Sequence, residues 1–263
     1  MEELVNAAPK IVIIDQLLAL RKYILFFAVL FAAIGAKAQA GYNYYEMGVG
    51  TDVSYVRGFT NIPRQDNHLA VALNFIYNYN PYLPIEAEIQ KGTLSGGDTT
   101  VAVDRYGRKF KNNYLAFALH ADVQLGAAID YEGSWFLSAV KNFYVGTGVG
   151  FISNSNKVQR TNLILANGPL TYVFPGKDNS INLMIPIRVG YEFRIFDYYN
   201  EPSFAIDIGY IHNIVFGEGL DGYNDPTNKF KNNAVDQYRQ FVVGFKYYFG
   251  NTVSYNKLVR DFR

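Results

Sequence analysis

Apolar and polar residues alternate along most of the chain with a period of two. The clearest stretch runs from residue 181 to residue 195, where every odd position is apolar and most even positions are polar or glycine. Successive side chains of a β-strand point to opposite faces, so this pattern predicts a strand with one apolar face. Similar stretches predict seven more strands, which begin near residues 45, 69, 85, 115, 143, 204 and 241.

Periodicity alone fits either a soluble sandwich or a membrane barrel, and the connections favour the barrel. If the first strand rises from the periplasm, the outer links are long and mostly polar: 57–67, 93–112, 154–180 and 217–236. Two of the three inner links (80–84, 127–142 and 197–203) are short, as in outer-membrane barrels. Aromatic residues gather at the inner strand ends, as in an interfacial belt: Tyr42, Tyr44, Tyr45, Tyr77, Tyr79, Tyr82, Tyr198, Tyr199, Tyr247 and Phe249.

The start of the chain has the order of a secretory signal. Arg21 and Lys22 precede an apolar run over 23–34, which is followed by Ala-Lys-Ala-Gln-Ala at 36–40. This order predicts a signal peptide cleaved after Ala38 or Ala40. Residues 1–20 fit poorly in front of it, and we hypothesise a start codon assigned too early, with the natural start near Leu20.

These patterns predict an all-β fold: an eight-stranded antiparallel up-and-down transmembrane β-barrel preceded by a signal peptide. The predicted organisation is an N-terminal extension and signal peptide over 1–40, a barrel over 41–250 and a periplasmic tail over 251–263. The predicted location is the outer membrane of a Gram-negative cell. A soluble lipocalin-like barrel stays open as an alternative.

Composition removes several classes of function. The net charge of +1 gives no reason to expect a nucleic-acid partner. The chain has no cysteine, which excludes disulfides, a thiol nucleophile and Cys-ligated metals. No motif indicates a cofactor, a metal site or catalytic residues. The glycines at 146, 148 and 150 lack the spacing of a nucleotide-binding loop, and we interpret them as a stripe that leaves room in the lumen.

Charged residues recur on the predicted lumen face. An eight-stranded barrel is just filled by its side chains, so these charges must be paired or neutralised inside it. We expect a salt-bridge and hydrogen-bond plug, and a narrow gated path for protons or small ions is the alternative. The predicted polar network of the lumen comprises Glu46, Asp52, Glu86, Glu88, His120, Asp122, Arg188, Glu192, Arg194, Asp207 and Lys246.

Two further segments suggest contacts with the membrane. The inner link 127–142 contains Trp135 and Phe136, and it fits either a short amphipathic helix on the membrane surface or an ordered loop under the barrel. The second outer link carries basic residues that suit lipopolysaccharide phosphates, or solvent: Arg105, Arg108, Lys109 and Lys111. The expected partners are therefore outer-membrane lipids and lipopolysaccharide, with other envelope proteins as further candidates.

The segments 144–150 (YVGTGVG) and 246–250 (KYYFG), with Ala38-Gln39 at the end of the signal, resemble the small porin-like outer-membrane β-barrel family, especially its PorT-type members. The resemblance covers about 41–250 and implies location and fold more than chemistry. It favours a structural or binding barrel that acts through its external loops. The alternatives are an accessory component of a protein-secretion or envelope-assembly machine, and an outer-membrane lipid-modifying enzyme.

Overall fold

The computed structural model describes residues 42–100, 102–104, 106–131, 133–160, 173–224 and 235–255. The predicted signal peptide and residues 256–263 lie outside these ranges. Eight strands, a 3-10 turn (η1) and one short helix (α2) follow in the order β1 (Tyr42–Phe59), β2 (Asn67–Asn80), β3 (Leu83–Gly97), β4 (Lys109–Gln124), η1 (Leu125–Ala127), α2 (Trp135–Val140), β5 (Phe143–Val158), β6 (Asn179–Phe196), β7 (Pro202–Val215) and β8 (Gln237–Tyr255).

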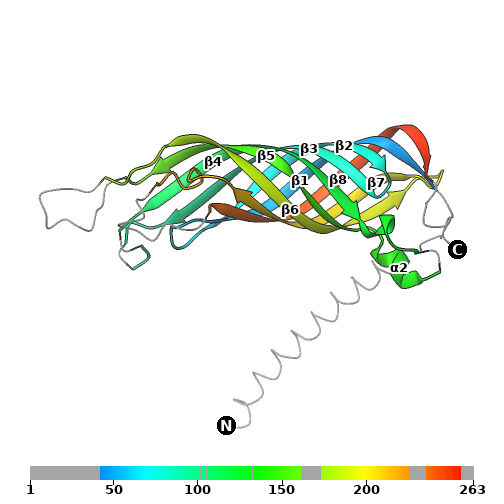
Figure 1. Ribbon diagram of the computed structural model, residues 1–263, viewed down its shortest axis with the longest axis horizontal. Helices are drawn as coiled ribbons and strands as arrows, with labels where there is room; N and C mark the ends of the chain where they lie inside the picture. Colours follow the sequence, from blue (N-terminus) through cyan, green and yellow to red (C-terminus); the bar gives the residue numbers. More distant parts are fainter. Residues whose placement is uncertain are drawn as a thin grey trace, which may run out of the picture.

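Each strand pairs with the next in the chain, and β8 pairs with β1 to close the sheet into an antiparallel barrel. The register is continuous across the closure, since Val53 of β1 lies opposite Val71 of β2 and Val243 of β8. Figure 1 shows the strands crossing a long cylinder obliquely. The predicted eight-stranded up-and-down fold is confirmed.

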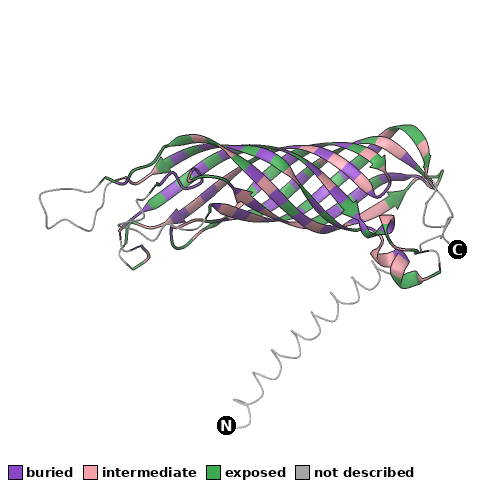
Figure 2. Ribbon diagram, in the orientation of Figure 1, coloured by how far each residue is buried: buried purple, intermediate pink, exposed green. Residues whose placement is uncertain are grey.

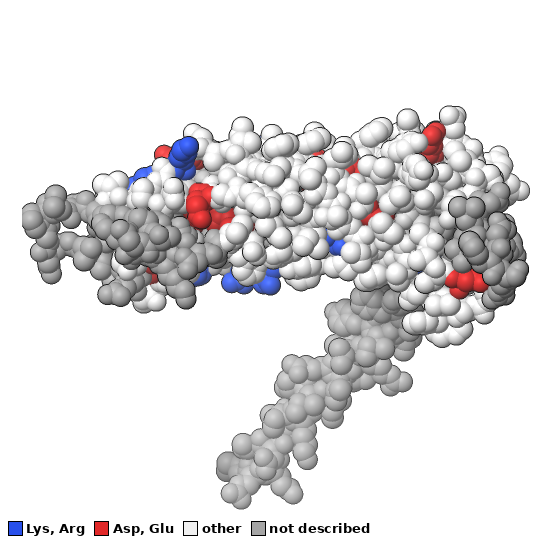
Figure 3. All heavy atoms as spheres, viewed as in Figure 1, with Lys and Arg blue, Asp and Glu red and all other residues white. Residues whose placement is uncertain are grey.

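The outside of the barrel is apolar. Burial alternates residue by residue along β4, and the stripes of Figure 2 show the same alternation around the barrel. Large apolar side chains point outward, and Leu73 is 67% and Phe241 58% exposed. The middle of the face seen in Figure 3 is largely free of charged side chains. An apolar exterior around a closed sheet is the surface that a lipid bilayer requires.

The two ends of the barrel differ. One, the turn end, carries the connections 81–82, 125–142 and 197–201, together with the paired residues Tyr42 and Tyr255. The other, the loop end, carries 60–66, 98–108, 159–178 and 216–236. Among the described residues, no helix has the length and apolar character needed to cross a bilayer.

The strands extend further toward the loop end than the sequence pattern predicted. β3 continues to Gly97 and β4 begins at Lys109, so the predicted link 93–112 is shortened to 98–108. In this region the outward positions are polar, as at Thr93 and Lys111, although the pairing continues. The pattern of apolar outward and polar inward residues that predicts a strand ends where the barrel leaves the apolar band. The hydrogen-bonded pairing of the strands continues beyond that point.

β8 also extends past Gly250, where we had placed the end of the barrel. Its pairing with β1 shifts by one residue between the pairs Met47–Phe249 and Tyr45–Thr252. Gly250 sits in this bulge with φ +102°, a conformation that favours glycine. The predicted tail therefore begins as strand, and β8 ends at Tyr255.

The interior has two parts. Toward the loop end it is an apolar core that contains Val56, Phe110 and Ile152. The segment 217–223, which we call the wedge, packs Leu220 and Tyr223 into this core. Toward the turn end the interior holds the charged side chains described next.

Candidate functional site: the closed lumen

The structure places ten of the eleven predicted network residues inside the barrel. Nine are buried, and the side chain of Arg194 is 6% exposed. They come from six of the eight strands. β2 contributes none of them, and the inward positions of β5 at the same level are occupied by glycines. The ten are Asp52, Glu86, Glu88, His120, Asp122, Arg188, Glu192, Arg194, Asp207 and Lys246.

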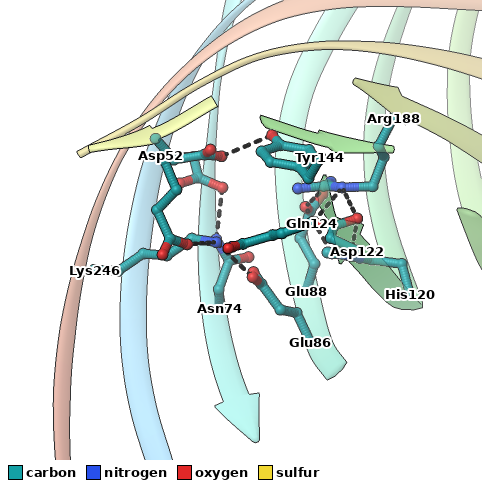
Figure 4. Close-up of polar contacts among 12 residues, drawn as sticks. Asp52, Asn74, Glu86, Glu88, His120, Asp122, Gln124, Tyr144, Arg188 and Lys246 are labelled. Carbon is teal, nitrogen blue, oxygen red and sulfur yellow. Dashed lines mark hydrogen bonds and ion pairs between the residues drawn. The ribbon is translucent and has the colours of Figure 1, made fainter. Parts of the chain in front are cut away.

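Arg188 joins two carboxylates from other strands. Its Nε lies 3.2 Å from Asp122 Oδ1, and its Nη1 lies 3.3 Å from Glu88 Oε2 (Figure 4). His120 lies between the same carboxylates, 3.7 Å from Glu88 Oε2 and 3.6 Å from Asp122 Oδ1. This cluster links β3, β4 and β6 across the lumen.

The glycine stripe makes room for this cluster. A Cβ atom on Gly146 would overlap Asp122 Oδ1, and one on Gly148 would lie 2.6 Å from His120 Cβ. Neither position has room for a side chain larger than that of glycine. The stripe therefore lets β4 place its acid and its imidazole in the interior, which is the role we predicted for it.

Lys246 anchors a second cluster nearer the turn end. Its Nζ contacts Glu86 and lies 3.6 Å from Glu192 Oε2. Glu192 also accepts hydrogen bonds from Arg194 (2.8 Å) and from Tyr248 (3.0 Å). Arg194 donates further to Gln124 Oε1 at 2.7 Å and to a carbonyl of the β2–β3 turn. The second cluster thus ties β3, β6 and β8 to that turn.

Asp52 and Asp207 have no basic partner within ion-pair distance among the described residues. Both face Gly244 of β8, Asp52 from β1 and Asp207 from β7. Asp52 accepts a hydrogen bond from the Asn74 amide at 2.5 Å, and Asp207 accepts one from the Tyr144 hydroxyl at 3.1 Å. The ten network residues therefore include six carboxylates and three Arg or Lys side chains, so neutral donors stabilise part of the negative charge.

The prediction fails at Glu46. Its Oε1 accepts an exposed hydrogen bond from the Tyr77 hydroxyl at 3.5 Å, and Tyr77 faces outward. Glu46 lies opposite the β8 bulge, where the strict alternation of inward and outward side chains ends. Counting alternate inward and outward positions from the regular part of β1 (the parity of a residue) therefore assigns Glu46 to the wrong face.

The network also includes residues that we had not assigned to it. Asn74, Gln124, Tyr144 and Tyr248 supply the neutral donors and acceptors around the charges. Asn74 and Gln124 stand on the predicted polar faces of their strands, so parity was a sufficient signal for them. Tyr144 has the parity of Gly146, and Tyr248 has the parity of Lys246, so the same signal would have placed both in the lumen, where they are buried.

The wedge closes the lumen at the loop end. The Asn112 and Asn156 amides, which point inward from β4 and β5, donate to the Leu220 and Gly219 carbonyls at 2.9 Å each. The Leu220 amide donates to Asp236 Oδ2 at 2.9 Å. Burial, with a contribution from the neighbouring Asp221 carboxylate, raises the pKa of Asp236 to about 9. Asp236 therefore holds the wedge as a neutral acid at neutral pH.

Of the basic residues expected to meet lipopolysaccharide, some are exposed and one is buried. Arg108 is buried, and its Nε pairs with Asp104 at 2.9 Å, so it does not reach lipid. Arg105 lies outside the described residues. Lys109 and Lys111 stand exposed at outward positions of β4.

The link 125–142 contains the short helix α2, as one of our two interpretations expected. The Ser134 hydroxyl accepts a hydrogen bond from the Leu137 amide and caps the helix. The Tyr191 hydroxyl of β6 donates to the Ala139 carbonyl and fastens α2 to the barrel. Trp135 and Phe136 stay exposed at the turn end. Apolar and aromatic side chains in this position suit the membrane surface.

A closed antiparallel sheet with an even number of strands, an apolar exterior and a filled polar lumen is a defined architecture. It is that of the eight-stranded outer-membrane β-barrels. No family model and no curated protein matches the sequence.

Solved outer-membrane barrels share this fold with the chain. Neisserial surface protein A is 12% identical, with a TM-score of 0.41 over 78% of this chain and 97% of that one. The attachment invasion locus protein Ail of Yersinia pestis is 11% identical, with a TM-score of 0.41 over 78% and 99%. OprG of Pseudomonas aeruginosa is 11% identical, with a TM-score of 0.36. The assignment of this barrel therefore rests on its own strand pairing and surface, and the finer PorT-type resemblance stays a prediction.

The Arg188 cluster predicts a large effect on stability. Replacing Arg188 with Met leaves Glu88 and Asp122 buried without their shared cation, which typically costs about 3–5 kcal/mol. Guanidinium unfolding of the barrel in detergent micelles measures the loss. Lys157→Met, at an exposed outward position, is the matched control and should change stability by less than about 0.5 kcal/mol. Equal stability of R188M and the parent would contradict the role of the cluster.

The neutral state of Asp236 predicts a pH dependence. The folded barrel keeps a proton that the unfolded chain releases above its ordinary pKa, so stability should fall as the pH rises from about 4 to about 9. Asp236→Asn keeps an acceptor for the Leu220 amide and should remove this dependence, with a gain of about 1–3 kcal/mol at pH 8. Unfolding curves at several pH values test it, with D98N in the loop 98–108 as control. A D236N barrel that keeps the parent pH profile would refute the assignment.

Proposed function

We propose that this protein is an outer-membrane barrel with a structural or binding role that it performs through its external loops. The closed lumen carries the proposal, because two barriers stand in series along it. The wedge fills the loop end with apolar side chains, and the two ion-pair clusters fill the turn end. Solutes of ordinary size have no path through such an interior, so recognition is left to the two ends.

The lengths of the connections support the orientation. Short turns face the periplasm and longer loops face the exterior in outer-membrane barrels. By this rule the turn end, with α2, is periplasmic and the loop end is external. Lipopolysaccharide in the outer leaflet would then surround the loop end.

The enzyme alternative gains little from the geometry at the loop end. The Ser95 hydroxyl lies 2.8 Å from His68 Nε2 and donates to Asp66 Oδ2 at 2.9 Å. In a catalytic triad the serine proton goes to the histidine, and the carboxylate orients the imidazole. Here the serine hydroxyl donates its hydrogen bond to the carboxylate instead. We therefore propose a non-enzymatic role.

A second candidate is an accessory role in an envelope machine, the alternative drawn from the PorT-type resemblance. The observation that favours it is the exposure of Trp135, Phe136 and Tyr198 at the turn end. A partner in the periplasm would find these side chains accessible, although the inner leaflet of the membrane would also cover them. Co-purification of envelope proteins that is lost in W135A would favour this candidate.

Single cysteines test the location and orientation, because the chain has no cysteine of its own. Thr99→Cys stands exposed in a predicted external loop, and Tyr198→Cys stands exposed in a periplasmic turn. A membrane-impermeant maleimide should label T99C on intact cells and Y198C only after the outer membrane is permeabilised. Labelling of Y198C on intact cells, or of neither variant, would overturn the proposal.

Conductance tests the closed lumen. The purified barrel in planar bilayers should give no current steps, while a wide porin reconstituted in the same way serves as the positive control. Reproducible steps from the barrel would favour the gated path for protons or small ions. They would also show that the wedge and the ion-pair clusters open together.

A further inference from the structure

Two arginines face each other on the outside of the barrel. Arg57 of β1 lies directly opposite Arg239 of β8, and His212 of β7 lies opposite Arg239 on its other side. We call these three residues the cationic row. Directly opposed side chains on one face of a sheet are about 5 Å apart at Cβ, and like charges in this position destabilise the pair.

No described carboxylate compensates this repulsion. Neither arginine has an ion-pair partner in the described part of the chain, and the Nε of Arg57 is buried without a hydrogen-bond partner. The guanidinium of Arg239 is held 4.7 Å from the centre of the Phe59 ring, which lies further toward the loop end. The cationic row therefore carries two arginines, neither of which has a carboxylate within ion-pair distance among the described residues.

The position of the cationic row along the barrel axis indicates which layer of the membrane it faces. One pleat repeat closer to the middle of the barrel, Tyr55, Phe241 and Tyr210 form an aromatic row on the same three strands. Aromatic rings sit at the membrane–water interface, and the phosphates of lipids lie just beyond them. The cationic row thus stands at headgroup height on the loop-end side of the apolar band.

We propose that Arg57 and Arg239 bind a phosphate of the lipid A part of lipopolysaccharide in the outer leaflet. Arginine presents a planar fork of donors that matches the oxygens of a phosphate, and a dianion between two guanidinium groups removes their repulsion. This inference deepens the proposed function and rests on its location and orientation. It names residues outside the predicted link 93–112, where the sequence had suggested the contact.

Affinity for lipid A tests the site. The folded barrel in detergent micelles is titrated with bis-phosphorylated lipid A, with dephosphorylated lipid A and with phosphatidylglycerol at about 0.15 M salt. The parent should bind the bis-phosphorylated form most tightly. Arg57→Gln with Arg239→Gln should weaken that binding about tenfold or more, since charge-assisted hydrogen bonds are lost. The same variant should leave binding of the dephosphorylated form unchanged.

Two further variants complete the design. Arg57→Lys with Arg239→Lys keeps the charge and should retain part of the affinity. Arg64→Gln with Lys177→Gln removes two exposed cations from the loop end and should bind like the parent. Heat-modifiable migration on gels verifies that each variant is folded.

Three outcomes would overturn the inference. They are unchanged affinity in R57Q/R239Q, an equal loss in R64Q/K177Q, and binding of phosphatidylglycerol as tight as that of lipid A. The last would mean that the row recognises any anionic lipid. Failure of the proposed function is distinguishable, because it would appear in the cysteine labelling on cells, whereas the lipid titration uses purified barrel.

Discussion

The closed hydrogen-bonded ladder is the constraint on which the rest of this structure depends. Inside a bilayer no water satisfies an open strand edge, so the sheet must return to its first strand. Pairing of β8 with β1 provides that closure over the whole length of both strands. Once the ring has eight strands, its interior is narrow enough to be filled by side chains. The packed lumen, the apolar exterior and the concentration of accessible groups at the ends all follow.

The sequence predicted this fold well because the membrane imposes the alternation that defines each strand. The prediction was accurate where lipid lies outside and the lumen inside, as along β6. It fell short where that contrast ends. Thr93 and Lys111 are polar on the outside, so nothing in their pattern distinguishes a strand from a loop. Glu46 follows the parity of β1, but a bulge in the neighbouring strand changes its direction.

The sequence could predict which residues line the lumen, but it could not predict which of them form ion pairs with one another. Parity alone placed Arg188, Glu88 and Asp122 on inward faces, yet Glu88 and Arg188 stand 100 residues apart and meet only through the shear of the closed sheet. The same holds for Lys246 and Glu86, which are 160 residues apart. Such contacts depend on register, and register is a property of pairs of strands that no single stretch of sequence contains.

These long-range ion pairs have a consequence for how the barrel is specified. A slip of one residue in any strand would exchange its inward and outward faces and place charges of the lumen in lipid. The buried clusters therefore penalise every wrong register far more than they stabilise the correct one, since buried ion pairs contribute little net stability themselves. The charges of the lumen thereby select one alignment of eight similar strands. That alignment brings Arg57 and Arg239 side by side on the outside of the barrel.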